Sequence, residues 1–211
     1  MNRTWLKVAS LAVAAALLVP SLAGQARLTP AELTAAKSMG SRQAPITLEI
    51  FSDYQCPDCK RLHTTTTRQV IDNYVSSGKV FLVHRDFPLS MHTYSRQAAR
   101  WLNAAAAAGV FQATENALYA KQEEWGMTGN IEQSLAAALP AADMRRVRAM
   151  ELSQRAQLDA AVQADLNLGN SRNVSGTPSI FVFHRGQMTP LPPGSVSYAL
   201  LKQYLDYLLQ R

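Results

Sequence analysis

The feature that most constrains this chain is a pair of cysteines, Cys56 and Cys59, which stand three positions apart and are the only cysteines among 211 residues. The preceding segment, 46–51, is apolar and rich in β-forming residues, so it is predicted to be a strand. The following segment, 57–77, has the pattern of a helix and ends before Gly78, a natural C-terminal cap. A Cys-x-x-Cys motif between a strand and a helix is typical of a dithiol that is reversibly oxidised to a disulfide.

The position of the motif predicts different roles for its two sulfur atoms. Cys56 precedes Pro57, a residue suited to the first turn of a helix, so the Cys56 sulfur would lie at the helix N-terminus. Unpaired amides and the positive end of the helix dipole stabilise a thiolate there. Cys59, one turn later, is close enough to resolve a mixed disulfide, so Cys56 is the expected nucleophile and Cys59 the resolving thiol. Pro57 and Asp58 lie between them and are expected to tune the redox potential.

The first 26 residues have the layout of a secretory signal peptide. A short basic start ends at Lys7, an uncharged apolar run follows over 8–19, and small residues surround Ala23 and Ala26, the two expected cleavage positions. The apolar run is shorter than the roughly 20 residues that a membrane span needs. An uncleaved membrane anchor remains the alternative. The protein is therefore expected to be exported to the periplasm or extracytoplasmic envelope, where disulfides persist.

The charge of the chain indicates a mildly basic surface rather than a nucleic-acid site. Twenty-one Lys and Arg against 15 Asp and Glu give a formal net charge of +6, which falls to +4 if Arg3 and Lys7 leave with the signal peptide. The remaining cations are spread along the sequence, for example at 145–148, where arginines stand beside Asp143 and Glu151. No binding of nucleic acid is expected from this distribution.

The elements around the cysteine motif predict a right-handed βαβ unit. Segment 79–85 is rich in β-forming residues, and a strand, a crossover helix and a second strand would place the strands at 46–51 and 79–85 in parallel. Before this unit, Thr29 and Pro30 have the features of a helix start, and Gly40 would end this short helix. The same helix suggests a dimerising arm, although the sequence specifies no oligomeric state.

The second half of the chain predicts a helical block followed by a return to β structure. From residue 91 to about 170 the sequence is rich in alanine, with helical spacing and no strand pattern. Helices are expected at 93–107, 111–123, 131–139, 141–150 and 153–168, and strands at 179–183 and 187–189 precede a closing helix at 195–209. The chain is thus divided into a signal peptide (1–26), a short helix and linker (27–44) and one α/β domain (45–211), whose core (45–90 and 171–211) is interrupted by an all-helical insertion (91–170).

A second motif, Val-Ser-Gly-Thr-Pro-Ser at 174–179, stands just before the strand at 179–183. An ordinary trans peptide bond between Thr177 and Pro178 is one interpretation. A cis bond is the other, because this loop would then lie opposite the cysteines and turn the Thr177 backbone toward a bound peptide. Such a peptide could pair with the protein as an added strand.

Three motifs in this order resemble the DsbA-like thiol–disulfide oxidoreductases, which are bacterial envelope proteins with a thioredoxin-like fold and a helical insertion. The motifs are Phe-Ser-Asp-Tyr-Gln-Cys-Pro-Asp-Cys at 51–59, Arg-Asp-Phe-Pro-Leu at 85–89 and the segment 174–179. The resemblance extends from about residue 45 to the C-terminus. It implies a redox-active Cys56–Cys59 disulfide with no further cofactor, a cis Pro178, and contact of Thr177 with the substrate backbone. It also implies that the partners are protein or peptide thiols and disulfides, and a membrane redox partner that recycles the cysteine pair.

Two residues depart from the pattern of these relatives. Many of them carry a buried acidic residue six positions before the first cysteine, whereas this chain has Ile50 there. Glu49 would point to the opposite face of the strand, so removal of the Cys59 proton is expected to rely on water or on Asp58. Asp58 also replaces a histidine of the strongest oxidants. Its negative charge predicts a higher Cys56 pKa than theirs and a less oxidising pair.

Two other functions remain as alternatives. Cys56, Cys59 and His63 fall at i, i+3 and i+7 of one helix, and two sulfurs with an imidazole suit copper or zinc. No second cysteine pair exists to close a structural zinc site. The simpler interpretation of His63 is a solvent-facing helix residue, so no metal site is predicted. The third possibility is a non-catalytic binding module in which the cysteines form a structural disulfide.

Several further side chains invite a functional interpretation but have a simpler structural one. Asp53 and Asp86 follow predicted strands and are expected to cap loops rather than to act as catalytic carboxylates. The large aromatic residues of the helical segment are expected to form its core. Trp125 is the exception, because it stands beside Gly126 and could line a groove near the cysteines. The aromatic core residues expected are Trp101, Phe111 and Tyr119.

Overall fold

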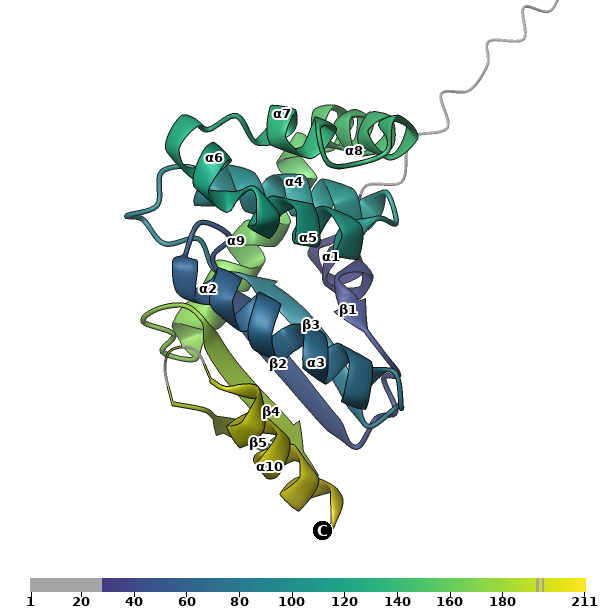
Figure 1. Ribbon diagram of the computed structural model, residues 1–211, viewed down its shortest axis with the longest axis vertical. Helices are drawn as coiled ribbons and strands as arrows, with labels where there is room; N and C mark the ends of the chain where they lie inside the picture. Colours follow the sequence, from purple (N-terminus) through teal and green to yellow (C-terminus); the bar gives the residue numbers. More distant parts are fainter. Residues whose placement is uncertain (1–27, 193, 195) are drawn as a thin grey trace, which may run out of the picture.

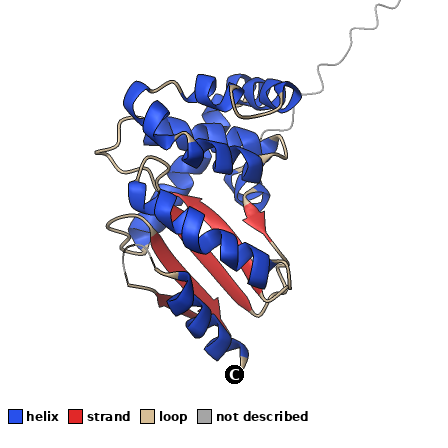
Figure 2. Cartoon of the chain, in the orientation of Figure 1, coloured by secondary structure: helices blue, strands red, loops and turns tan. Residues whose placement is uncertain are grey.

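The computed structural model describes residues 28–192, 194 and 196–211, with a five-stranded sheet at its centre (Figures 1 and 2). The strands are β1 (Ser38–Met39), β2 (Ile46–Ser52), β3 (Val80–Asp86), β4 (Ser179–His184) and β5 (Gln187–Pro190), in the sheet order β1-β3-β2-β4-β5. β2 and β3 are parallel, with Ile46 opposite Val80, and β4 is antiparallel to β2. The predicted βαβ unit is therefore confirmed. The predicted signal peptide lies outside the described residues.

The crossover helix between β2 and β3 runs without interruption from Pro57 to Val75. Its parts are α2 (Pro57–Leu62), the π-helical η1 (His63–Thr67), α3 (Arg68–Val70) and the π-helical η2 (Ile71–Val75). The predicted helix at 57–77 is confirmed, but its π turns were not predicted. The first π turn contains a stretch of threonines whose hydroxyls compete for helix carbonyls: Thr64 and Thr65 donate to the carbonyls of Lys60 and Arg61.

The two faces of the sheet bury different kinds of side chain. The crossover helix and the C-terminal helix α10 (Tyr198–Leu209) cover the face that carries Leu48 and Ile50, with an apolar core between them. α1 (Pro30–Ala36) and α9 (Arg155–Ser171) contact β3 from the other face. There Phe51 packs edge-on against Phe87 and Phe181.

A buried ion pair also stabilises the face covered by α1 and α9. Lys37 Nζ lies 2.5 Å from Asp86 Oδ2 and 3.2 Å from Asp165 Oδ2, and the Lys37 side chain is 0 % exposed. Asp86 also accepts hydrogen bonds from the Tyr54 hydroxyl and the Asn103 amide. The expectation that Asp86 caps a loop is therefore wrong, because it lies at the centre of a polar network in the core.

The N-terminal segment is part of the same core. The predicted capping box is present, since the Glu32 N–H donates to Thr29 Oγ1 and the Glu32 carboxylate accepts from the Thr29 N–H. α1 ends at Ala36, and Ser38 pairs with Val83 as strand β1, where the sequence predicted helix. Leu33 and Lys37 are buried, so one face of this segment packs against its own domain. Its suggested role as a dimerising arm stays a prediction.

The segment between β3 and β4 is helical, and in Figure 1 most of it lies above one end of the sheet. Its helices are α4 (Ser95–Ala107), α5 (Phe111–Ala120), α6 (Gln122–Thr128), α7 (Ile131–Ala136), α8 (Ala141–Ser153) and α9. Gly169 lies within α9, where a Cβ atom would stand only 2.5 Å from the Phe87 ring, so glycine permits this close approach. Among the residues described, no helix combines the length and apolar composition needed to cross a bilayer.

The aromatic residues of this block form its core, as predicted. Trp101, Phe111 and Tyr119 are all buried in one apolar cluster. Trp125 is also in this cluster at 0 % exposure, and its indole N–H donates to the Leu118 carbonyl at 2.8 Å. The hypothesis that Trp125 lines a groove near the cysteines is therefore wrong.

Candidate active site

The loop before the crossover helix is held in place by the Asp53 carboxylate. Asp53 Oδ1 accepts from the Gln55 N–H at 2.8 Å. Asp53 Oδ2 accepts from the Leu89 N–H at 2.8 Å and lies 2.7 Å from His92 Nδ1. The predicted capping role of Asp53 is confirmed. These contacts fix the turn that presents Cys56 as the N-cap of α2, with Pro57 in the first helical position.

Cys56 lies against the second predicted motif. The Cys56 thiol donates to the Thr177 carbonyl at 3.4 Å, and the peptide bond between Thr177 and Pro178 is cis. The implied cis proline opposite the cysteines is thus confirmed. A hydrogen bond from the Cys59 thiol is the main cause that lowers the pKa of Cys56 to about 6, with burial opposing it and the backbone amides of Cys59 and Asp58 adding to it.

Cys59 has the opposite environment. It is only 1 % exposed, and burial raises the pKa of its thiol well above the usual value. The Asp53 N–H, which donates to Cys59 Sγ at 3.4 Å, opposes this rise. Thr177 Oγ1 is close enough to lower the pKa of both thiols, yet it has no hydrogen bond of ordinary geometry within the described chain. At neutral pH the pair therefore holds a Cys56 thiolate and a Cys59 thiol, as the predicted roles require.

Neither carboxylate considered from the sequence can reach the Cys59 thiol. The Asp58 side chain is 44 % exposed and pairs with Arg61 at 2.5 Å on the helix surface. The expectation that Asp58 accepts the Cys59 proton is therefore wrong. Glu49 faces the other side of the sheet, where it pairs with Arg85 at 3.1 Å and with Arg172. The prediction that Glu49 cannot serve Cys59 is confirmed.

His63 differs most from its sequence interpretation. It was expected on the solvent-facing side of the helix, but it is 5 % exposed and stacks on the Tyr119 ring at 4.7 Å. His63 Nε2 lies 2.8 Å from Asn116 Oδ1, and His63 Nδ1 lies 3.6 Å from Glu115 Oε2. Within residues 28–192, 194 and 196–211, no three His, Cys, Asp or Glu side chains are grouped to hold a metal ion.

Two groups from the helical insertion belong to this site and were missed from the sequence. The Gln122 amide donates to the Tyr54 carbonyl at 2.8 Å and to the Cys56 carbonyl at 3.0 Å. Glu115 lies behind Cys59, and its Oε1 is 3.1 Å from His84 Nδ1. Glu115 is one of the inward positions of α5, at 111, 114, 115, 118 and 119. In the sequence, the only sign that Glu115 belongs to the site was a glutamate at a helix position otherwise occupied by packing residues.

Comparisons with known proteins agree with this fold. The family model described as Thioredoxin matches residues 34–202. The Na(+)/H(+) antiporter NhaA 3 of Salinispora tropica is 28% identical over 172 residues, which are 81% of this chain but only 25% of the antiporter. The chain thus spans about a quarter of that relative's length. The probable disulfide bond formation protein D of Bacillus anthracis is 24% identical over 157 residues, 69% of each chain.

Solved structures show the same architecture. The crystal structure of α-DsbA1 from Wolbachia pipientis superposes with a TM-score of 0.65 at 18% identity, covering 82% of this chain and 90% of that one. This chain belongs to the thioredoxin family, and its fold is the thioredoxin-like fold with a helical insertion that the DsbA-like proteins have.

Proposed function

We propose that this protein is a thiol–disulfide oxidoreductase that exchanges disulfides with protein substrates through Cys56 and Cys59. The observation that carries the proposal is the contrast between the two sulfurs. Cys56, with a pKa lowered to about 6 chiefly by a hydrogen bond from Cys59, lies at a helix start beside the Thr177 carbonyl. Cys59, whose pKa is raised by burial, lies behind it. The name of the Bacillus anthracis relative, a probable disulfide bond formation protein, supports the same chemistry.

The proposed reaction needs no cofactor beyond the Cys56–Cys59 disulfide. In the oxidising direction, a substrate thiolate attacks Cys56 Sγ, the Cys56–Cys59 bond breaks, and Cys59 leaves with the electron pair and takes up a proton. A second thiolate of the substrate then attacks the substrate sulfur that is bonded to Cys56, and Cys56 leaves as a thiolate. The substrate gains a disulfide, and the protein keeps both electrons. The same steps in reverse would reduce a substrate disulfide.

The surroundings of Cys56 favour an extended peptide as the substrate. We propose that the Thr177 backbone, set by the cis bond to Pro178, contacts the substrate main chain. Gln55 connects two flanking segments, since its side chain accepts from the Tyr94 N–H and donates to the Gly126 carbonyl. These segments carry Met91 and Met127, each 78 % exposed. Flexible exposed methionines suit binding of varied apolar sequences.

We also propose that the protein is exported and acts in the periplasm or extracytoplasmic envelope. The signal-like sequence of residues 1–26 supports this location. A membrane redox protein would then restore the cysteine pair after each turnover. Cell fractionation of a tagged full-length chain, compared with a variant that lacks residues 1–26, tests the location directly.

The experiment that tests the proposed activity is the reduction potential of the Cys56/Cys59 pair, measured by equilibration with glutathione buffers and trapping of free thiols. A value between about −270 and −120 mV, the range of disulfide-exchanging proteins, is expected. Its position in that range would show whether the pair tends to donate or to remove disulfides. A value below about −300 mV would mark a structural disulfide and would refute the proposal.

A further inference from the structure

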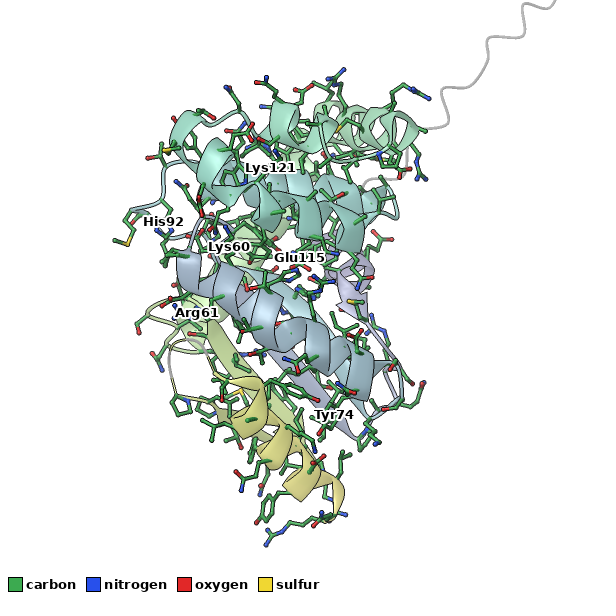
Figure 3. The ribbon with its side chains drawn as sticks, viewed as in Figure 1. Lys60, Arg61, Tyr74, His92, Glu115 and Lys121 are labelled. Carbon is green, nitrogen blue, oxygen red and sulfur yellow. The ribbon has the colours of Figure 1, made fainter. Side chains whose placement is uncertain are left out.

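A small cavity behind Cys59 contains polar atoms that lack partners. It is lined by Ile50, Ser52, Cys59, Leu62, His63, Thr67, His84, Glu115 and Tyr119. Over the part of the chain that the structure describes, Glu115 Oε2 and His84 Nε2 are buried without a hydrogen-bond partner. The cavity offers about 10 Å³ to the centre of a water-sized sphere, which is close to the space that one water needs. Figure 3 shows Glu115 between the crossover helix and the helical insertion.

The proposed disulfide exchange needs a proton route at this position. Cys59 leaves as a thiolate in the oxidising direction and must lose its proton in the reducing direction. Its sulfur is buried at 1 % exposure, so bulk water does not reach it freely. Asp58 is at the surface with Arg61, and Asp53 is occupied by the loop that it caps. Glu115 is the carboxylate that shares a cavity with Cys59.

We propose that Glu115 exchanges the proton of Cys59 across this cavity and that His63 connects Glu115 to solvent. The inference rests on the proposed thiol–disulfide function and supplies its proton path. In this chain Ile50 occupies the strand position at which many DsbA-like relatives carry a buried acidic residue. The proposal assigns the acid–base role to a residue of the helical insertion instead. The helical insertion would thus contribute to the chemistry of the cysteine pair as well as to its surroundings.

The outward part of the path depends on His63. A second cavity of about 90 Å³ lies on the other side of this side chain, lined by His63, Arg68, Ile71, Asp72, Gln112 and Asn116. Four of these residues are exposed, so this cavity opens to the surface. His63 is the residue that lines both cavities, with Nδ1 toward Glu115 and Nε2 2.8 Å from Asn116 Oδ1. Its ring can therefore pass a proton between a buried and an exposed site.

The charged groups around Glu115 suit a proton acceptor. Burial raises the pKa of this carboxyl, but nearby His84 of β3, His63 of η1 and Lys37 after α1 outweigh burial and hold it below its usual value. Tyr119 of α5 and Cys59 of α2 complete the titratable groups that line the cavity, and both have a pKa raised chiefly by burial. Glu115 is therefore a carboxylate when Cys59 is a thiol.

The proton step balances with the sulfur chemistry. In the resolving step of a mixed disulfide at Cys56, the proton of Cys59 moves to Glu115 through the cavity. Cys59 Sγ then forms a bond to Cys56 Sγ, and the bond from Cys56 to the other thiol breaks. The released thiolate takes its proton from solvent, and Glu115 returns its proton to solvent through His63. In the opposite direction each transfer is reversed.

The test is the rate of this resolving step against pH, in Glu115→Gln and in a matched control, Glu151→Gln. Glu151 is also a buried glutamate of the insertion, but it pairs with Arg100 and Arg155 away from the cavity. Reduced protein is mixed with excess oxidised glutathione, and acid-quenched samples are analysed by mass spectrometry. Glu115→Gln is expected to resolve its mixed disulfide about 100-fold more slowly at neutral pH, a typical loss for a general base.

The pH profile separates a proton path from a structural effect. The wild type and Glu151→Gln should reach a plateau once Glu115 is ionised, whereas the rate of Glu115→Gln should keep rising about tenfold per pH unit. Glu115→Asp should restore the plateau.

If Glu115→Gln does not fold, His63→Asn is measured instead and should slow the same step. Equal profiles for the cavity variants and Glu151→Gln would overturn the inference. If the wild type resolves its mixed disulfide with glutathione but exchanges no disulfide with proteins, only the proposed function would be refuted.

Discussion

At the scale of single residues, two sulfurs three positions apart differ because Cys56 lies at a helix start and accepts a hydrogen bond from Cys59, while Cys59 is enclosed. Cys56 receives hydrogen bonds that favour its thiolate, and Cys59 has lost the water that would stabilise a charge. The identity and order of this pair followed from the sequence. The direction in which their neighbours point did not, because it depends on the packing of the insertion.

The lowered pKa of Cys56 predicts a pH dependence of stability in the reduced protein. The folded pKa of about 6 lies below the ordinary value of 9.0, so the stabilisation is present above pH 9 and is lost as the pH falls through 6. Between pH 6 and 8 the free energy of unfolding should rise by about 2 kcal/mol more in the reduced wild type than in Cys56→Ser. Urea unfolding at both pH values measures this difference. Parallel pH profiles for the two proteins would contradict the pKa of about 6.

Asp58 predicts a change in the redox potential. Its carboxylate lies one residue before Cys59, and its negative charge disfavours the Cys56 thiolate. Asp58→His should lower the Cys56 pKa and make the pair more oxidising. The shift should be modest, because Arg61 already pairs with Asp58 at the surface. Asp72→His, on the same crossover helix but farther along it, is the matched control in a glutathione titration. A more reducing pair in Asp58→His would show that the charge of Asp58 does not act in this way.

At the scale of elements, local patterns predicted most helices and strands because each pattern reports burial on one face. The strands at 46–51 and 79–85 were found because they consist of β-forming residues. β1 was missed because two residues carry no periodicity, and it exists only by pairing with β3. The π turns were missed for a similar reason: helical spacing alone does not distinguish them from an α-helix. His63 itself continues the α turn, since its N–H donates to the Cys59 carbonyl, so it lies on the same buried face as Cys59. Its burial was not predicted because the side chains that cover it, Tyr119 and Asn116, come from the insertion.

The buried Lys37 predicts the largest loss of stability from a single charge. Lys37 lies between Asp86 and Asp165 without solvent, so Lys37→Met leaves the buried Asp86 carboxylate without a cation, whereas Asp165 keeps its pair with Arg85. Breaking a buried ion pair in this way should reduce the free energy of unfolding by about 3 to 5 kcal/mol. Lys202→Met removes only a solvent-exposed pair with Asp206 and should leave the unfolding midpoint almost unchanged. Similar unfolding midpoints in urea for the two variants would rule out a structural role for the buried pair.

At the scale of the whole molecule, the helical insertion and the α/β core both contribute residues to the cysteine site. The core supplies both cysteines and the cis-proline loop, whereas the insertion supplies Glu115 behind Cys59 and Gln122 beside Cys56. The order of elements was enough to predict that an insertion exists. Its contribution to the site could not be predicted, because contacts between segments more than 50 residues apart depend on tertiary packing.

Substitution of Gln122 tests whether the insertion and the core unfold together. Its amide donates to the Tyr54 and Cys56 carbonyls, so it joins α6 to the loop that presents the nucleophile. Gln122→Ala leaves two carbonyls without this donor and should destabilise the protein by about 1 to 3 kcal/mol. Unfolding followed by tryptophan fluorescence, which reports the insertion, and by circular dichroism should remain a single coincident transition, shifted to lower urea. Gln133→Ala, at an exposed position of α7, should unfold as the wild type does. Two separate transitions in Gln122→Ala would mean that the insertion and the core are stable independently and that the site is assembled by docking one against the other.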